Sequence, residues 1–480
     1  MAYSSALTIY SSAQPGSISP STFRNGGQGM AVPGYAMVRQ ERDFQFSNNR
    51  NNIRFTDVAA LIDPTTVLFE SLTDPTGTRV VEQNFQFDLV STQKLLEKYI
   101  DKNIGVVQSR GTSTETFNGV LTSTNGGLVL KNPDGSVRIV NQYTNVNLPS
   151  LPGGLISKPT LVWDVAAQKT GNHKTRVSYQ TGGMSWWSDY NLSYSEGADA
   201  NSCNLDVGAW VTIINQSGAG YQDTRLKLVA GDVQRAQTRG NVAAAPMAMR
   251  KEAVLADSVG FEEKTLFEYH LYTLGFPTTL PDNSTKQLEL FPTARGVPCE
   301  KALVYQGQAG MGYYGGLMTD RAFSVESNKK VDVYLSFKNS KDNHMGMPLP
   351  AGKIRVSKLD SADKTLEFIG EDVIDHTPKE ETVRIRMGSA FDVVGDRTQK
   401  DFRIDINGHW MEEDIEVKVR NQKNEAVNVQ VRENLYRWTN WQISKNNQSY
   451  NKTDSRSIVF PIRIAKGAEA VVKYTARYTW

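Results

Sequence analysis

The stretch TGGMSWWSDYNLSY, residues 181–194, decides whether the middle of this chain is helical or extended. Its large side chains recur at every second position, with one interruption at Ser188. They are Met184, Trp186, Tyr190, Leu192 and Tyr194. Because alternate residues of a strand point to opposite faces of its sheet, this pattern predicts a strand with one buried face. Trp187 is then the one ring on the polar face, and it is a candidate contact for a ligand or partner.

The last part of the chain alternates in the same way. Apolar and polar residues alternate in four runs, at residues 415–419, 427–431, 460–464 and 472–478. Short strands of this kind, separated by polar turns, are typical of two packed sheets that each keep one face in water. Residues 401–480 are therefore predicted to form an immunoglobulin-like β-sandwich.

One helix interrupts the extended pattern in the first third of the chain. Residues 91–101 contain two apolar pairs with i,i+4 spacing, and Ser91 is a suitable N-cap. Four short runs with strand character follow, separated by Gly, Asn and Asp, up to about residue 154. We predict a small helix-plus-barrel insertion within an N-terminal β domain of residues 35–157.

The complete chain is predicted to be all-β, with several domains built from antiparallel β-sandwiches. Its 480 residues exceed one ordinary core and suggest roughly three domains. Residues 1–34 combine a short strand with a flexible arm rich in Ser, Gly and Pro. Residues 158–400 hold longer alternating strands and are assigned to a large central β-sandwich region, which a loop at 240–257 interrupts.

The composition argues against nucleic acid as a partner and against a transmembrane segment. The 53 basic and 51 acidic residues leave a formal net charge of +2, without a run of like charges. No apolar run is long enough to span a bilayer as a helix. The opening MAYSSALTIY lacks the basic start and apolar block of a signal peptide, so the chain as written predicts a cytoplasmic protein.

The two cysteines are Cys203 and Cys299, which lie far apart in the chain. Neither belongs to a CxxC motif or a Cys/His cluster, so a structural zinc site is excluded. Cysteine is among the most buried residue types, and two buried free thiols are the favoured interpretation. One long-range disulfide is the alternative.

Motifs for catalysis, metals and cofactors are absent. The five histidines occur singly, and neither a nucleophile elbow nor a phosphate-binding loop is present. GMGYYG at 310–315 has the spacing of a dinucleotide-binding loop, but no helical pattern follows it. A glycine-rich turn is the better interpretation, and Tyr313 and Tyr314 on this turn are candidate contacts for a sugar or a protein. We expect no enzyme, no cofactor and no metal site.

Acidic residues gather in one place, within FIGEDVIDHTPKEE at residues 368–381. Glu371 and Asp375 could serve a hydrolase if the fold brought them to one cleft. In a strand, however, half of these carboxylates face away from the other half. A solvated segment with local ion pairs is the simpler interpretation.

Several segments of the chain are distinctive when taken together, and they include DVAALIDPTTVLFESL (57–72), SYQTGGMSWWSDYNL (178–192), GAWVTIINQSG (208–218) and LPAGKIRV (349–356). With these segments the chain resembles the mucoidy-inhibitor-A-like family, whose C-terminal part is described as a domain of unknown function, family forty-one thirty-nine. The resemblance spans nearly the whole chain and implies an all-β, multi-domain protein without assigned catalytic residues. It also implies an extracellular or periplasmic location, since many relatives are exported in bacteria. The chain departs from the family in lacking coiled-coil heptads and a signal peptide.

The sequence therefore predicts a non-catalytic structural or interaction protein, a cell-envelope or extracellular component that self-assembles. Its expected partners are proteins or further copies of itself. The alternative is a carbohydrate-binding β-sandwich protein that holds a glycan with Trp187, Tyr313 and Tyr314. The weakest alternative is a carboxylate-dependent hydrolase.

Overall fold

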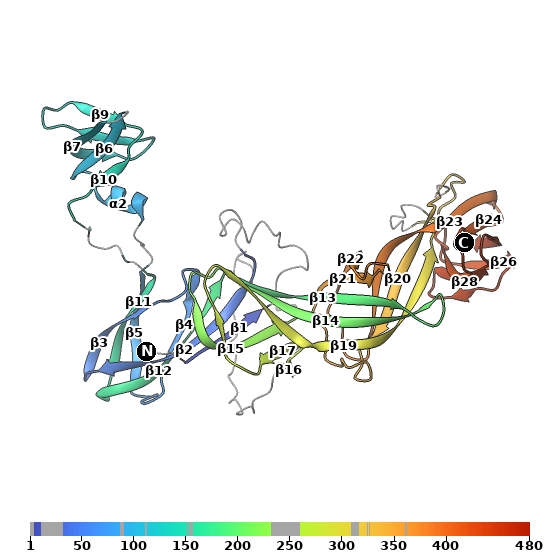
Figure 1. Ribbon diagram of the computed structural model, residues 1–480, viewed down its shortest axis with the longest axis horizontal. Coiled ribbons are helices and arrows are strands. Elements are labelled where there is room, and N and C mark those ends of the chain that lie inside the picture. Colours follow the sequence, from blue (N-terminus) through green and yellow to red (C-terminus); the bar gives the residue numbers. More distant parts are fainter. Residues whose placement is uncertain are drawn as a thin grey trace.

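The computed structural model describes residues 4–10, 32–86, 91–110, 113–150, 152, 156, 158–231, 260–308, 316–323, 325, 327–360 and 362–480. In this part of the chain almost every element is a strand, which confirms the all-β, multi-domain prediction. Four β modules lie in a row along the long axis of the molecule, and a small unit projects beside the first of them (Figure 1). Most of the predicted arm, residues 12–31, and the predicted loop at 240–257 lie outside the described residues.

Each module is built around five strands, named A to E here in chain order. In module 1 these are β1 (Ser4–Tyr10), β2 (Tyr35–Phe46), β3 (Asn49–Thr56), β11 (Thr160–Ala167) and β12 (Gly171–Gly182). In module 2 they are β13 (Met184–Glu196), β14 (Ser202–Asn215), β15 (Tyr221–Ala230), β17 (Tyr269–Leu274) and the first part of β19 (Ser284–Tyr305). Module 3 has the second part of β19, β20 (Lys330–Lys338), β21 (Gly352–Leu359), β22 (Leu366–Ile374) and the first part of β23 (Thr382–Asp405). Module 4 has the second part of β23, β24 (Trp410–Asn421), β25 (Val427–Asn434), β28 (Ser457–Ile464) and β29 (Glu469–Thr479).

One pairing scheme recurs in all four modules. Strand A pairs antiparallel with strand B, and B pairs antiparallel with E. Strand C pairs antiparallel with D. Further strands extend these sheets, namely β4 (Ile62–Ser71), β5 (Thr78–Gln86), β16 (Phe261–Leu266), β18 (Thr278–Leu280), β26 (Trp441–Asn446) and β27 (Asn451–Lys452). One architectural unit is therefore repeated along the chain.

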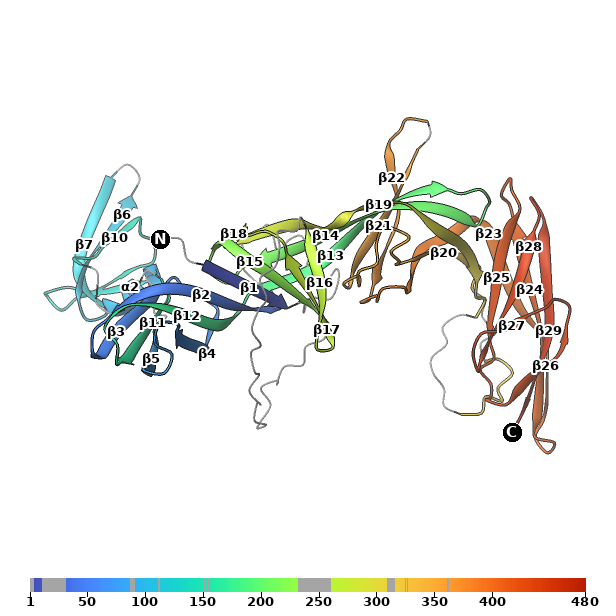
Figure 2. The same ribbon diagram turned by 90° about the horizontal axis from the view of Figure 1, so that it is seen from below.

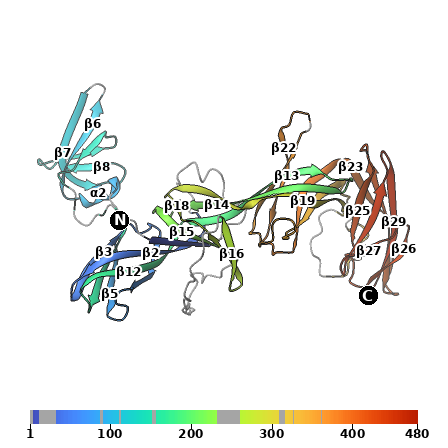
Figure 3. The ribbon, with the colours of Figure 1, turned by 60° about the horizontal axis from the view of Figure 1, so that its bottom comes forward.

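Neighbouring modules share strands. The 22-residue β19 is strand E of module 2 and strand A of module 3, and the 24-residue β23 joins modules 3 and 4 in the same way. Between modules 1 and 2 only Gly183 separates β12 from β13, with φ of 74° and with Gln216 O 2.6 Å from the place of a Cβ. Glycine is the one residue that tolerates both conditions. Continuous strands thus join modules 2 to 3 and 3 to 4, and a single glycine joins strand E of module 1 to strand A of module 2 (Figure 3).

A parallel pairing adds a second link between neighbours. Strand C of each later module pairs with strand A of the preceding module: β15 with β1, β21 with β13, and β25 with β19. Over the paired residues, strands β1, β13 and β19 consequently have strand partners on both edges.

A buried asparagine stands at the end of strand B in modules 2, 3 and 4. The three residues are Asn215, Asn339 and Asn421, and none is more than 1% exposed. In module 2, Nδ2 of Asn215 donates to Pro281 O at 3.0 Å, in the connection between strands D and E. Asn339 and Asn421 make the equivalent bonds to Pro378 O and Ala465 O, both at 3.1 Å. These bonds give each buried asparagine amide a hydrogen-bond partner and tie the end of strand B to the connection between strands D and E.

The projecting unit contains the predicted helix and the predicted short strands. Helix α2 (Thr92–Lys98) begins after Ser91, whose Oγ accepts the Lys94 N–H at 3.2 Å. It is followed by β6 (Asn103–Arg110), β7 (Ser113–Ser123), β8 (Leu128–Lys131), β9 (Val137–Val140) and β10 (Asn145–Asn147), which form one five-stranded sheet. The helix is shorter than the predicted 91–101, because the chain leaves the helix at Tyr99 and Asp101 takes a left-handed φ of 63°. No helix among the described residues is long and apolar enough to cross a membrane.

The structure divides the chain at other places than the predicted boundaries. The predicted boundary after residue 157 separates β11 and β12 from β2 and β3, with which they pair. The predicted boundary after residue 400 falls within β23. Both differences arise because the modules are held together by strand pairings between residues distant in sequence, which local alternation does not reveal.

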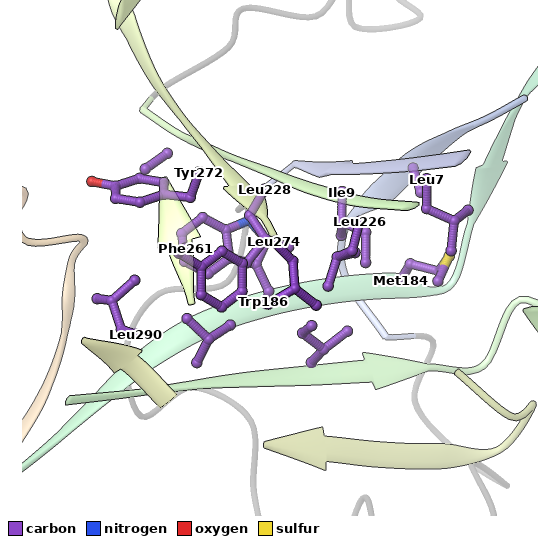
Figure 4. Close-up of a cluster of buried hydrophobic side chains, with 14 of the residues drawn as sticks. Leu7, Ile9, Met184, Trp186, Leu226, Leu228, Phe261, Tyr272, Leu274 and Leu290 are labelled. Carbon is purple, nitrogen blue, oxygen red and sulfur yellow. The ribbon is translucent and has the colours of Figure 1, made fainter. Parts of the chain in front are cut away.

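The strand at 181–194 has the buried face that its alternation predicts. Met184, Trp186, Tyr190, Leu192 and Tyr194 are all buried. Trp186 is fully buried, and Figure 4 shows its ring among Leu228, Phe261 and Leu274 of module 2. Its ring centroid lies 6.1 Å from that of Tyr272, edge to face. The face opposite Trp186 is therefore the one that a ligand or partner can reach.

Cys203 and Cys299 form a disulfide bond, so the favoured interpretation of two free thiols is wrong. The reason is the register of β14 with β19, which places the two residues directly opposite each other. Their Cα atoms are 4.8 Å apart, within the range that a disulfide spans. The bond links strands B and E of module 2 at the point where β19 continues into module 3.

Candidate functional site

The predicted candidate Trp187 lies on the outer face of β13, where alternation placed it. It is half-buried, and its indole N–H donates to Asp189 Oδ2 at 2.9 Å. Asp189 is 9% exposed. The N–H edge of the Trp187 ring is therefore bonded to a neighbouring side chain of the same strand, and only part of the ring faces solvent.

Asp189 is the centre of a polar network on this face, called the Asp189 network below. Besides Trp187, it accepts a bond from Thr212 Oγ1 at 2.7 Å and one from Arg355 Nη1 at 3.1 Å. Arg355 in turn lies 3.8 Å from Glu371. The network thus ties together β14, β13, β21 and β22, which belong to modules 2 and 3.

Trp210 was not identified from the sequence, although it lies on the same face. It stands directly opposite Asp189 in the β13–β14 pair and is 39% exposed. Its neighbours Ala209 and Val211 are fully buried, so the alternation that identified Trp187 could also have identified Trp210. Trp187 and Trp210 together make an aromatic pair that flanks a carboxylate on a polar sheet face.

The other two predicted site residues, Tyr313 and Tyr314, lie outside the described residues. Trp187 is therefore the one predicted contact whose surroundings are known. The acidic segment of residues 368–381 is described, and its carboxylates contact different partners. Glu371 Oε1 lies 3.5 Å from Lys353 Nζ, whereas Asp372 Oδ2 accepts the Arg386 backbone N–H at 2.6 Å.

Three carboxylates of this segment are directed toward different neighbours. Glu371 faces β21, Asp372 faces β23, and Glu380 Oε2 pairs with Lys338 Nζ at 2.7 Å. Among the residues that the structure describes, no group of three or more His, Cys, Asp or Glu side chains is arranged to hold a metal ion.

One cavity of about 510 Å³ lies where modules 1 and 2 meet. Its lining is mixed in charge, with Arg42 and Lys158 beside Asp57, Asp223 and Asp282. Lys158 and Asp57 form an ion pair at 2.5 Å across the lining. The two cationic and three acidic side chains leave a formal net charge of −1, which is too small to give this cavity a clear preference for a ligand of one sign.

A third surface is apolar. Strand β22 projects from the row of modules (Figure 2). It exposes Leu366, Phe368 and Val373, at 61%, 59% and 47% respectively. Large exposed side chains grouped on an outer strand are typical of surfaces that bind other proteins.

No protein-family model, no curated protein and no solved structure matches this chain. Its role is therefore argued from the geometry of the described residues. The three surfaces above offer contacts for partners.

Proposed function

We propose that this protein is a non-catalytic structural component that associates with further copies of itself, in the cell envelope or outside the cell. The observation that supports this best is the sharing of β19 and β23 between modules. Because one hydrogen-bonded strand crosses the junctions of modules 2 and 3 and of modules 3 and 4, bending at these junctions would break a sheet rather than flex a linker. A stiff row of modules suits spacing and assembly.

The disulfide supports the proposed location. Disulfides persist in oxidising compartments and are rare in the reducing cytosol. Cys203–Cys299 closes a long segment of module 2, which is a structural use rather than a redox use. The resemblance to the mucoidy-inhibitor-A-like family stays a prediction, and its implication of an exported protein agrees with this location.

Sedimentation of the purified chain tests the self-association. We expect the mean mass to rise above the 53.3 kDa of one chain as the concentration increases, because an assembling component must expose complementary surfaces. A single species of one-chain mass over a wide concentration range would contradict the proposal. Reducing agent serves as a control for associations that arise from disulfide exchange.

Glycan binding is the second candidate function, and the Trp187–Trp210 pair favours it. Sugar rings pack on aromatic faces, while a nearby carboxylate and arginine bind hydroxyl groups. Asp189 and Arg355 occupy such positions beside Trp187.

Substituting the two tryptophans separately tests this candidate. We expect Trp187→Ala and Trp210→Ala each to weaken glycan affinity about tenfold, because a stacked ring contributes roughly 1 to 1.5 kcal/mol. Binding of the unmodified chain on a glycan array must be established first, and Trp441→Ala in module 4 serves as the control. Absence of glycan binding by the folded, unmodified chain would remove this candidate.

A further inference from the structure

We infer that copies of this protein associate head to tail, by parallel pairing of β3 in one copy with the second part of β23 in the next. This inference rests on the proposed self-association and names the surfaces that would carry it. The pairing would repeat, between two chains, the link that strand C of one module makes with strand A of the preceding module. The partner that binds the outer edge of β3 or of β23 is therefore a second copy of the chain.

The chain itself contains three examples of this link. They are the parallel pairs of β15 with β1, β21 with β13, and β25 with β19. Each time, strand C and its partner strand D extend the sheet formed by strands A and B of the module before. The modules are thus shaped to receive a C strand on the outer edge of strand A.

The fourth A strand, in module 4, has no such partner among the described residues. On its outer edge, Gly395 N donates to Lys329 O at 3.0 Å and Arg397 N donates to Ser327 Oγ at 2.9 Å. Beyond these contacts, residues 400–405 pair with β24 alone. The Phe402 N–H is bonded to the side chain of Asp401 instead of a strand carbonyl. Residues 400–405 are called the open edge of β23 below.

Burial shows what this open edge lacks. In the three paired A strands, the core-facing residues Ile9, Leu192 and Tyr305 are at most 2% exposed. Ile404 faces the core as well, since it stands opposite the fully buried Met411. Phe402, over which the Arg437 guanidinium lies, is 8% exposed, whereas Ile404 is 37% exposed. A neighbouring C strand with its sheet would cover Ile404.

The complementary half of the link is β3, strand C of module 1. Among the described residues it pairs with β11 alone, so its outer edge is open. Its sequence NRNNIRFT contains two arginines and no acid. At the other end of the molecule, Arg403 beside the open edge of β23 contacts three carboxylates, those of Asp401, Glu412 and Asp414. Residues 400–405, KDFRID, carry two basic and two acidic side chains, and Arg50 of β3 is paired with Asp164, so the pairing rests on the repeated strand link rather than on charge.

The two edges lie on modules 1 and 4, at opposite ends of the row (Figure 1). Such an interface uses two different surfaces of one chain, so each added copy presents a fresh open edge. The association is heterologous and leads to open filaments unless the row closes into a ring.

Two blocked variants test this arrangement. The β23-blocked variant is Ile404→Lys, since a charge on a core-facing position prevents edge pairing. The β3-blocked variant is chosen from Asn52→Pro and Ile53→Pro. In an antiparallel pair the N–H groups of consecutive residues point to opposite edges of the strand. One of these two prolines therefore removes an N–H from the outer edge of β3 and leaves the β3–β11 hydrogen bonds intact, and the variant that folds is used. Val137→Lys, on the exposed edge strand β9, is the matched control.

The mixing experiment is read by sedimentation. We expect each blocked variant alone to stay at the 53.3 kDa mass of one chain, and an equal mixture to form a species of twice that mass. The mixture pairs because each variant keeps the edge that the other has lost. The control should assemble like the unmodified chain.

The outcomes separate this inference from the proposal on which it rests. An unmodified chain that never associates contradicts both. An unmodified chain that associates, together with blocked variants that associate equally well, overturns the head-to-tail pairing alone and indicates another surface such as β22. Blocked variants that stay single even when mixed also overturn it, because head-to-tail pairing requires the intact edge of each variant to bind the intact edge of the other.

Discussion

Replacing Arg437 with methionine should destabilise module 4 by about 3 to 5 kcal/mol, the usual cost of removing one partner of a buried ion pair. The Arg437 side chain has no exposed surface, and its Nε lies 2.6 Å from Glu413 Oε1. The N–H does not point directly at that oxygen, so the contact is an ion pair rather than a hydrogen bond. Without the arginine, Glu413 would keep a charge in the core with no cation beside it.

Arg437 also fastens the segment that precedes strand B of module 3. Its Nη1 donates to Met318 O at 3.1 Å and to Asp320 O at 2.7 Å. The Tyr478 hydroxyl donates to Glu413 Oε2 at 3.1 Å. Burial raises the pKa of Tyr478 well above its usual value and Glu413 adds to the rise, so the phenol keeps the proton that it donates. The substitution therefore disrupts a connected network.

Hydrogen exchange of the β24 and β29 amides measures this effect within module 4, which a global unfolding curve of four modules would not resolve. We expect protection of these amides to fall by roughly two to four orders of magnitude. Arg321→Met is the control, because Arg321 is exposed and lies 3.9 Å from Asp401, a surface pair worth about 0 to 1 kcal/mol. Equal losses of amide protection in Arg437→Met and Arg321→Met would show that the buried ion pair contributes no more to stability than the exposed one. Replacing Arg437 and Glu413 together by Met and Leu should restore much of the protection.

This buried pair could have been suspected from the sequence. Glu413 stands between Met411 and Ile415, and all three side chains share the core-facing parity of β24. Glu433 breaks the run of β25 in the same way, and it accepts a bond from Arg397 Nε at 2.8 Å in the core. A carboxylate at a core position requires a buried partner. Which arginine serves as the partner depends on the fold, because Arg437 lies in the segment between β25 and β26 and meets Glu413 of β24 only in the packed module.

The same division between local and distant information explains the other outcomes. Side-chain alternation is local, so the strand character of module 4 and the opposite faces of Trp186 and Trp187 were predictable. The disulfide depends on the register of β14 with β19, and no local signal fixes that register. The repeat itself left a trace, since Asn215-Gln216 and Asn421-Gln422 both follow an alternating run. The sequence alone does not show that these two asparagines mark the ends of equivalent strands, because their shared role lies in buried hydrogen bonds that exist only in the folded chain.

Trp186→Ala should cost about 3 to 5 kcal/mol, the usual range for truncating a buried tryptophan. Its ring is fully buried among side chains from β15, β16 and β17, so the truncation would leave a cavity between strands A, C and D of module 2. Strand A of module 2 lies in a different sheet from strands C and D. The cavity could close only if these two sheets moved toward each other, and that movement would break the pairing of β15 with β1. The cavity should therefore stay largely open, which favours the upper part of the range.

Trp210→Ala is the matched control for this cost, because it removes the same side chain from the other face of the same pair of strands. Trp210 is 39% exposed, and its loss should change stability by no more than about 0.5 kcal/mol. Amide exchange in β13 and β15 should thus accelerate in Trp186→Ala and stay nearly unchanged in Trp210→Ala. Trp186→Phe should recover part of the loss, since a smaller ring leaves a smaller cavity. Similar protection in Trp186→Ala and Trp210→Ala would mean that alternation along residues 181–194 does not separate a core face from a surface face, and the assignment of Trp187 and Trp210 to an accessible surface would fail with it.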